Sequence, residues 1–380
     1  MDVPHVHTPG RDSDRILIFG AGAAVGWGVA SHDLALPGAL ARALSEATGR
    51  GADVDVFVDP GMRVADSLSA LRTLSLIRYD AVVVVLGVND ALQLTPLSTW
   101  RRELSKLLSA TAELSLDNTT IIVAGIQPIR SIPIFDTFLG TPAARHAIAL
   151  NSETTTLCSS LAQTEFVPLS FPEKSRSNDR HRAPYEYTQW GRVLASSLTP
   201  LLAAQLGSRD LRRNAGLVAV TEASRQDAVD GLALRNDESL ARLRDILTTA
   251  KRAFRVESAT ITVLDRDRQR YIAQVGAELE EIPRSSSFCN TAIHGVGVMI
   301  VRDAREDDRF GNGSGADGAP RIRFYAGFPI ELPSGERIGT LCVVDSRPRR
   351  PEEHIDEVLL RELALMVQRE LWLQTPDSAA

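Results

Sequence analysis

The first half of the chain alternates short apolar runs with longer stretches in which apolar residues recur at helical spacing. Residues 80–86 contain the run Ala-Val-Val-Val-Val-Leu, which is typical of a strand covered on both faces in a parallel sheet. Strands alternating with helices predict an α/β domain over residues 14–206, a parallel sheet with helices on both sides. The predicted strands are residues 15–19, 53–58, 80–86, 119–124 and 165–168, and the predicted helices are residues 36–48, 100–116, 142–163 and 184–206.

The pattern changes after residue 206. Residues 207–234 are rich in Arg, Asp and Ala and are predicted to form a mostly helical connector. Several strands then follow between two amphipathic helices, which predicts a separate α+β domain over residues 235–375. Its helices are predicted at residues 240–254 and 352–373, and its strands at residues 258–264, 270–275, 297–301, 325–332 and 339–344.

Length and charge narrow the class of protein. A chain of 380 residues exceeds the size at which single cores usually stop growing, which also favours two domains. A net charge of −6 gives no basic footprint for nucleic acid, and no apolar run is long enough to cross a membrane. Residues 1–13 are polar, lack the apolar segment of a secretory signal, and are predicted to be a disordered tail. Three widely spaced cysteines favour a reducing cytoplasm, and neither a cofactor nor a metal site is predicted.

Loops that follow the predicted strands carry the candidate chemistry of the first domain, because parallel α/β sheets bind ligands at the carboxyl ends of their strands. Gly20 to Val29 follows the first strand, Asp59 to Met62 the second, and Leu86 to Asp90 the third. The segment Asn178-Asp179-Arg180-His181 precedes the last helix.

These loops resemble the sequence blocks of the SGNH (GDSL-like) hydrolase family. Gly87-Val88-Asn89-Asp90 is similar to the Gly-x-Asn-Asp block of that family, and Gly61 lies where its oxyanion glycine occurs. Gly26-Trp27-Gly28-Val29 resembles the end of its first block, and His181, followed by Trp190-Gly191, resembles its catalytic-histidine block. The resemblance covers residues 14–206 and implies a three-layer, flavodoxin-like fold with a parallel sheet.

Two departures from the family's pattern concern the catalytic groups. Where the family has Gly-Asp-Ser, this chain has Gly20-Ala21-Gly22, and no Ser, Thr or Cys occurs over residues 20–29. Acyl transfer through a covalent intermediate needs an oxygen or sulfur nucleophile, which Gly22 cannot supply. The residue three before His181 is Asn178, with Asp179 one position out of register, and a neutral amide does not stabilise an imidazolium as a carboxylate does. The vestigial positions of a catalytic site are Gly22, Gly61, Asn89, Asp179 and His181.

Simpler roles stay open for three of these positions. Asn89 is equally well explained as a side chain that caps the following turn. His181 lies among arginines and is also explained as a surface histidine. Gly22 is also explained by a tight turn that needs no ligand.

A second family motif fits the same glycines. Gly20-x-Gly22-x-x-x-Gly26 after a strand resembles a dinucleotide-binding loop, which would make the chain an oxidoreductase. That motif requires an acidic residue about 20 positions further on, and Asp59 lies nearly twice as far along. The dinucleotide hypothesis therefore ranks second for this loop.

The second domain contains the sequences Ser287-Phe288-Cys289 and Arg323-Phe324-Tyr325-Ala326-Gly327 within a series of blocks. This series of blocks resembles the GAF domain family. GAF domains with the Ser-Phe-Cys and Arg-Phe-Tyr-Ala-Gly patterns found here often accompany bacterial histidine kinases and cyclic-dinucleotide enzymes. The resemblance implies an antiparallel sheet with helices on one face and a small-molecule pocket on the other, and a homodimer formed through the flanking helices. The blocks are residues 258–265 (Ser-Ala-Thr-Ile-Thr-Val-Leu-Asp), 284–293 (Arg-Ser-Ser-Ser-Phe-Cys-Asn-Thr-Ala-Ile), 301–304 (Val-Arg-Asp-Ala), 307–310 (Asp-Asp-Arg-Phe), 322–327 (Ile-Arg-Phe-Tyr-Ala-Gly) and 339–345 (Gly-Thr-Leu-Cys-Val-Val-Asp).

Aromatic residues in these blocks are predicted to form the apolar wall of the pocket, and two charged residues to orient its ligand. For each of the two phenylalanines a plain core position is the alternative. The predicted pocket residues are Phe288, Cys289, Phe324 and Tyr325 for the wall, and Asp303 or Arg323 for orientation.

Cys289 also admits a redox role, since some GAF relatives reduce free methionine sulfoxide with cysteines. That chemistry requires an accessible thiolate and usually a resolving cysteine. The available partner, Cys342, is predicted to lie in a central strand and to be buried. The sequence therefore favours structural roles for both thiols.

Taken together, these features favour a regulatory protein that lacks enzymatic activity. Ligand binding in the GAF-like pocket would shift the helical connector and with it the first domain, which requires different affinities for two states. An SGNH-type esterase with a non-standard nucleophile is one alternative, and a dinucleotide-binding oxidoreductase is the other.

Overall fold

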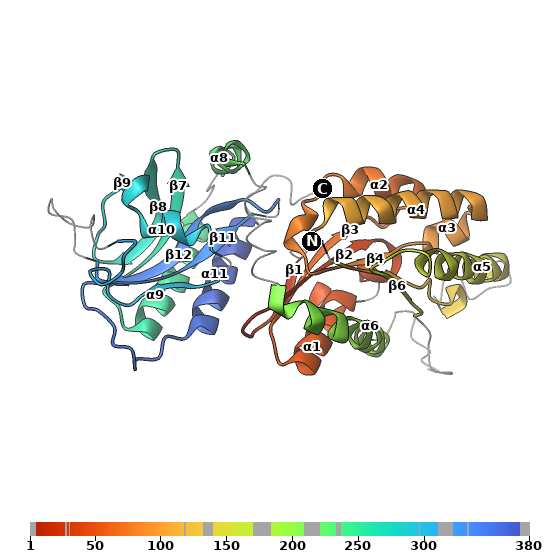
Figure 1. Cartoon of the computed structure of the whole chain (residues 1–380), viewed down its shortest axis with the longest axis horizontal. Helices are drawn as coiled ribbons and strands as arrows, with labels where there is room; N and C mark the ends of the chain where they lie inside the picture. Colours follow the sequence, from red (N-terminus) through yellow and green to blue (C-terminus); the bar gives the residue numbers. More distant parts are fainter. Residues whose placement is uncertain are drawn as a thin grey trace. The chain divides into compact units, whose positions relative to one another are not determined.

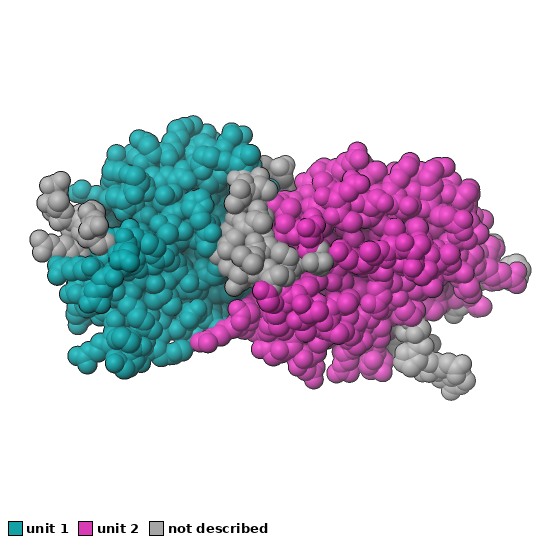
Figure 2. Space-filling view, in the orientation of Figure 1, with its two compact units in different colours: residues 1, 213–380 teal, residues 2–212 magenta. Residues whose placement is uncertain are grey.

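Two compact units make up the chain, residues 2–212 and residues 213–380 together with Met1 (Figure 2). The computed structural model describes residues 5–26, 29, 31–117, 119–131, 140–169, 184–208, 221–232, 237–295, 297–310, 322–332 and 334–372. No helix among these residues is both long and apolar enough to span a membrane.

The first unit is built on a six-stranded sheet in the order β1-β3-β2-β4-β5-β6. Strands β2 to β6 run parallel, and β1 pairs with β3 in the antiparallel direction at one edge. The parallel sheet that the sequence predicts is therefore confirmed, with one antiparallel strand added. The strands are β1 (His5–Thr8), β2 (Asp14–Gly20), β3 (Ala52–Val58), β4 (Ala81–Val85), β5 (Thr120–Ala124) and β6 (Thr164–Val167).

Helices cover both faces of this sheet and make a three-layer α/β fold (Figure 1). Helices α1 and α6 pack together on one face, and α2, α4 and α5 on the other. The apolar run of β4 supplies both cores: Val82 and Val84 join the cluster that contains Leu104 of α4, and Val83 joins the cluster that contains Leu40 of α1. The helices are α1 (Leu36–Thr48), α2 (Val64–Leu71), α3 (Val88–Leu92), α4 (Leu97–Leu114), α5 (Gly140–Cys158) and α6 (Pro184–Gln205), with short 3₁₀ turns at Gly22–Val25, His32–Leu34, Leu76–Arg78, Ile129–Ser131 and Leu206–Ser208.

Strand β1 corrects the prediction that residues 1–13 form a disordered tail. His5–Thr8 is paired with β3, and the His5 imidazole contacts the Asp55 carboxylate at 2.6 Å. A short polar strand at a sheet edge carries no apolar periodicity, so the sequence pattern does not distinguish it from a tail.

The second unit contains an antiparallel sheet in the order β10-β11-β12-β7-β8-β9. Helices α9 and α11 pack against each other and on one face, and α10 lies on the other face (Figure 1). This confirms the predicted α+β class. The elements are α9 (Asp237–Phe254), β7 (Ser258–Asp265), β8 (Arg268–Gly276), β9 (Ile282–Pro283), α10 (Phe288–Ala292), β10 (Met299–Val301), β11 (Phe324–Glu331), β12 (Arg337–Asp345) and α11 (Glu357–Trp372), with a 3₁₀ turn at Arg284–Ser286.

Helix α8 (Glu222–Asp230) lies within the predicted connector but packs as part of the second unit. The buried Arg225 guanidinium donates to the carbonyl of Leu264 at the end of β7. Ser224 donates to the Glu336 carboxylate at 2.6 Å. Helix α8, which lies in the described connector segment 221–232, is therefore fixed to the sheet of the second unit.

Candidate functional site

The loops after β2, β3 and β4 meet at the carboxyl edge of the parallel sheet, as the sequence predicts. The Ala21 amide donates to the Val85 carbonyl at 2.7 Å, and the Asp59 amide donates to the Gly20 carbonyl at 3.0 Å. The Asn89 side-chain amide reaches across to the loop that contains Gly61. Three of the five vestigial positions are thus brought together, whereas Asp179 and His181 lie outside the described residues.

Gly22 is held in a conformation that suits glycine. Its φ is +63°, in the left-handed region that L residues rarely adopt. A Cβ at this position would lie 3.0 Å from Cγ2 of Val88. A serine here would therefore meet both backbone strain and a close contact, and Gly22 itself offers no nucleophilic atom.

The polar groups beside Gly22 are engaged with the loops themselves. The Gly61 amide donates to the Asp59 carboxylate at 2.8 Å. The Asn89 side chain donates to the carbonyls of Pro60 at 2.8 Å and Met62 at 3.0 Å, which uses both of its N–H groups. In this structure Asn89 acts as a clamp between two loops.

The buried Asp90, next to Asn89 in the sequence, also connects these loops. Its carboxylate accepts from the Val64 amide at 3.1 Å and from the Thr95 hydroxyl at 3.0 Å. Burial raises the pKa of Asp90, and the hydrogen bonds lower it by less. The Gly-Val-Asn-Asp block therefore joins the loops after β3 and β4 and the start of α2.

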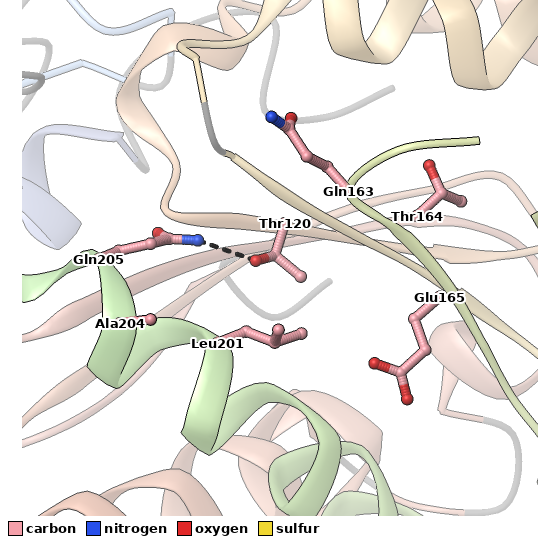
Figure 3. A pocket seen from close by; sticks show the side chains of 7 residues that line it. All are labelled: Thr120, Gln163, Thr164, Glu165, Leu201, Ala204 and Gln205. Carbon is pink, nitrogen blue, oxygen red and sulfur yellow. Dashed lines mark hydrogen bonds between the residues drawn. The ribbon is translucent and has the colours of Figure 1, made fainter.

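A hollow of about 580 Å³ lies at the opposite edge of the same sheet (Figure 3). Thr120 and Thr164, the first residues of β5 and β6, line it, and the Gln205 side chain donates to Thr120 across it at 2.8 Å. Because the loops of interest follow the last residues of the strands, this hollow is separate from them. Its lining is Thr120, Gln163, Thr164, Glu165, Leu201, Ala204 and Gln205.

The fold does not favour the dinucleotide hypothesis for Gly20, Gly22 and Gly26. A dinucleotide loop places a pyrophosphate at the start of a helix. Here only the short 3₁₀ turn Gly22–Val25 follows β2, and the first α-helix begins at Leu36. The parallel strands also follow the order 2-1-3-4-5, which differs from the 3-2-1-4-5-6 order of dinucleotide folds.

The second candidate site is the face of the antiparallel sheet beneath α10. Phe288 stacks on Tyr325 with ring centroids 5.2 Å apart and contacts Phe310 at 4.3 Å. Cys289 lies in the same buried cluster and is 2% exposed. Three predicted pocket residues, Phe288, Cys289 and Tyr325, are thus brought together, and their side chains fill the space between α10 and the sheet.

A line of polar side chains runs through this otherwise apolar interior. The Thr340 hydroxyl donates to Cys289 Sγ at 3.1 Å, and the Tyr325 hydroxyl donates to the same sulfur at 3.6 Å. Thr262 and Thr340 hydroxyls are 3.1 Å apart on neighbouring strands. Neither Thr262 nor Thr340 was predicted as a site residue, although the alternation Thr260-Ile261-Thr262 in β7 indicates a strand with polar residues on one face.

The remaining three predicted pocket residues lie elsewhere. Adjacent residues of a strand point to opposite faces, so Phe324 and Tyr325 cannot share one wall, and the Phe324 ring lies under the Arg349 guanidinium at 4.7 Å. Arg323 and Asp303 form a bidentate ion pair with each other. We therefore correct the predicted wall by removing Phe324, and we assign the Arg323–Asp303 pair to joining the loop after β10 to β11.

Among the described residues no group of three or more His, Cys, Asp or Glu side chains is arranged to hold a metal ion.

Comparisons with known proteins found a sequence relative and several similar solved structures. The chain is 40% identical over 146 residues to a cyclic di-GMP phosphodiesterase of Pseudomonas aeruginosa, a match that covers 38% of this chain and 25% of that protein. The chain thus spans a quarter of that relative's length. Among solved structures it is similar to the carbohydrate acetylesterase Est24 of Sinorhizobium meliloti, with 16% identity, a TM-score of 0.39, and coverage of 50% of this chain and 100% of that one. It is also similar to a type II free methionine-R-sulfoxide reductase of Thermoplasma acidophilum, with 15% identity, a TM-score of 0.31, and coverage of 37% and 96%.

The first unit contains a mostly parallel sheet between two layers of helices. The family match falls in the second unit, on the antiparallel sheet and the two helices that pack on it. Residues 238–371 of this chain form a GAF domain.

Proposed function

We propose that the chain is a regulatory protein whose GAF domain binds a small molecule and transmits its binding through helix α8. The observation that carries this proposal is the position of Arg284. This residue contacts α10, which covers the buried interior, and it also contacts α8. In the sequence, α8 follows the first unit and precedes the strands of the GAF sheet.

The contacts of Arg284 are directional and charged. Its Nε donates to the Asn290 side chain on α10 at 2.7 Å, and its terminal nitrogens bind the Glu222 carboxylate at the start of α8. Glu222 also pairs with Arg225, which is buried against β7. Hydrogen bonds from Arg225 and Arg284 lower the pKa of Glu222 to about 2, so this carboxylate stays ionised at neutral pH.

A ligand that enters the interior must displace α10, because Phe288 and Cys289 of α10 fill that space. Displacement of α10 moves Asn290 and with it the Arg284–Glu222 pair. Helix α8 then has one docking geometry without ligand and another with it, which supplies the differential binding that coupling requires.

Three features support the absence of esterase activity in the first unit. Gly22 has no side chain to act as nucleophile, and its conformation disfavours a substituted one. The donors of Gly61 and Asn89 are occupied by loop contacts. Removal of the nucleophile from a hydrolase leaves only weak residual catalysis from binding and oxyanion contacts.

The ligand-sensing proposal is tested by native mass spectrometry of the freshly purified chain, followed by hydrogen exchange of α8 with and without the metabolite that co-purifies. We expect a bound metabolite and a change in exchange over Glu222–Asp230. Glu222→Gln should retain the ligand but lose the response of α8, because the charged contact to Arg284 is removed. Glu238→Gln changes a carboxylate of α9 that pairs with Arg242, and this variant should behave as the wild type. Unchanged α8 exchange on ligand binding would refute the coupling.

The inactive-hydrolase proposal is tested separately with p-nitrophenyl esters. We expect no turnover above that of heat-denatured protein. Turnover that disappears in His181→Ala would show that the first unit is an esterase and would overturn this part of the proposal.

A further inference from the structure

Two cysteines that are far apart in the sequence meet inside the GAF domain. Cys289 is in α10 and Cys342 is in β12, and their sulfur atoms are 3.9 Å apart. Each residue is 2% exposed, and both thiols are free. The third cysteine, Cys158, lies in the first unit.

Hydroxyl groups surround the pair and favour a thiolate on one sulfur. Thr340 and Tyr325 donate to Cys289 Sγ, and the Thr260 hydroxyl lies 3.1 Å from Cys342 Sγ. Burial raises the pKa of the Cys289 thiol, but hydrogen bonds from Cys342, Thr262 and Thr340 outweigh it and lower the pKa from 9.0 to about 6. For the Cys342 thiol, the hydrogen bond to Cys289 and burial both raise the pKa. The surrounding donors therefore favour the thiolate form on Cys289 over the thiolate form on Cys342.

We propose that Cys289 and Cys342 form an oxidation site within the GAF domain, which takes a hydroperoxide as oxidant and closes to a disulfide. The inference rests on the distance between the sulfurs and the donors around them. It goes beyond the proposed ligand sensing and does not depend on it, because neither the first unit nor a bound metabolite takes part.

The reaction proceeds in two balanced steps. The Cys289 thiolate attacks the terminal oxygen of the hydroperoxide, so that an S–O bond forms, the O–O bond breaks, and the alkoxide leaves as an alcohol after taking a proton. Cys342 then attacks the sulfur of the Cys289 sulfenic acid, so that the S–S bond forms and the S–O bond breaks. The hydroxide that leaves takes the Cys342 proton and becomes water. Overall, two thiols and one hydroperoxide give one disulfide, one alcohol and one water.

Closure of the disulfide changes the position of α10. An S–S bond is about 2 Å long, so the sulfurs must approach by roughly 2 Å from their present separation. Cys342 is in a strand paired on both sides, by β11 and by β7, whereas Cys289 is in a five-residue helix. Most of the movement therefore falls on α10, which carries Phe288 away from its stacking position on Tyr325.

The direct test is intact mass spectrometry of the full chain after treatment with hydrogen peroxide, with peptide mapping of the product. We expect loss of the mass of two hydrogen atoms and a single linked peptide pair that contains Cys289 and Cys342. Cys158→Ser should give the same product, because burial raises the pKa of Cys158 to about 11 and keeps that thiol unreactive. A wild-type chain that keeps all three thiols, or that forms only sulfinic acid or disulfides between chains, would overturn the proposal.

Single variants identify the attacking sulfur. In Cys342→Ser the sulfenic acid should persist on Cys289 and be trapped by dimedone, whereas Cys289→Ser should give no dimedone adduct on Cys342. Thr340→Val keeps the size of the side chain but removes a donor to Cys289, so oxidation at pH 7 should slow several-fold and its pH profile should move to higher pH. Trapping on Cys342 instead, or an unchanged pH profile in Thr340→Val, would contradict the assignment of Cys289 as the reactive thiolate.

Discussion

Gly327 shows how little space the GAF interior leaves at a single position. The Tyr325 side chain leans along β11 over this glycine, and a Cβ added there would lie 2.2 Å from the Tyr325 hydroxyl oxygen. The tyrosine cannot move easily, because it is 1% exposed and is held between Phe288 and Cys289. The contact between the Tyr325 hydroxyl and Cys289 Sγ therefore requires glycine at position 327.

Gly327→Ala should lower the free energy of unfolding by about 1–3 kcal/mol, because the added methyl group overpacks the interior and displaces the ring of Tyr325. Urea denaturation and near-ultraviolet circular dichroism measure the two effects. Gly297→Ala is the matched control, because a Cβ at that position meets no atom within 4 Å. Equal stability of the two variants would contradict this account of Gly327.

Asp55 holds the antiparallel edge of the first unit. Its side chain is 15% exposed and binds His5 at 2.6 Å, Arg78 at 2.7 Å and the Tyr79 hydroxyl at 2.8 Å. Burial raises the pKa of Asp55, but the charge of Arg78 and the hydrogen bond of His5 outweigh it and hold the pKa well below its ordinary value. A carboxyl whose pKa is lower in the folded state stabilises that state above the unfolded pKa of about 3.9, and this stabilisation is lost as the pH falls.

Asp55→Asn should therefore cost about 3 kcal/mol of folding free energy at pH 7, since one partner of a largely buried ion pair is removed. The difference from the wild type should shrink as the pH falls from 5 to 3, which urea denaturation at several pH values measures. Asp66→Asn removes an exposed partner of Arg63 and should cost less than about 1 kcal/mol. A difference at Asp55 that does not vary with pH would refute the ionic contribution.

For single residues, the sequence predicts which side chains lie near the site better than it predicts which of them contact one another. Cys289 and Tyr325 could be placed near a pocket from their blocks, and the structure brings both into one cluster. The pairing of Cys289 with Cys342 could not be predicted, because it depends on how α10 crosses the sheet. Phe324 was predicted on the wrong face, although the period of two along a strand was sufficient to separate it from Tyr325.

Among the elements, those with continuous apolar runs were predicted well. The run in β4 is buried at every position, and the strand occupies Ala81–Val85 within the predicted residues 80–86. Elements whose stability comes from polar contacts were missed or misassigned. Strand β1 depends on pairing with β3, and α8 depends on the buried Arg225, and neither contact leaves a periodic pattern in the sequence.

The loops of the first unit give a prediction at this scale. Asn89→Ala removes both donors to the carbonyls of Pro60 and Met62, so the loop between β3 and α2 should exchange its amide hydrogens faster. Loss of the two bonds should cost about 1–2 kcal/mol, because the buried Met62 carbonyl loses this donor.

Hydrogen exchange over residues 59–63 measures the effect of Asn89→Ala. Gln93→Ala is the control, since Gln93 is exposed and accepts from Arg63 at the surface of the same region. Equal exchange in both variants would show that Asn89 does not clamp the loops.

For the whole molecule, the sequence predicts two domains, and the chain divides into two compact units. The predicted connector at residues 207–234 differs from the observed division, which falls between Arg212 and Arg213 and assigns α8 to the second unit. Helix α8 is polar and has no apolar stripe, and its composition alone is typical of a linker. The contacts of Glu222, Ser224 and the buried Arg225 make α8 part of the domain that we propose to sense a ligand.

Association between chains is the remaining property at this scale, and we propose that α11 carries it. Helices α9 and α11 lie together on one face of the GAF sheet, and Met366 of α11 is 51% exposed. A second copy that covers Met366 would bury this side chain, whereas a glutamate at the same position would place a charge in the interface.

Light scattering coupled to size exclusion should show a dimer for the wild type and, for Met366→Glu, a dissociation constant raised about tenfold or more, which corresponds to about 1.4 kcal/mol. Ile148→Glu changes a side chain that is 71% exposed on α5 of the first unit and should leave the dimer intact. A monomeric wild type, or a dimer lost through Ile148→Glu and kept in Met366→Glu, would exclude association through α11.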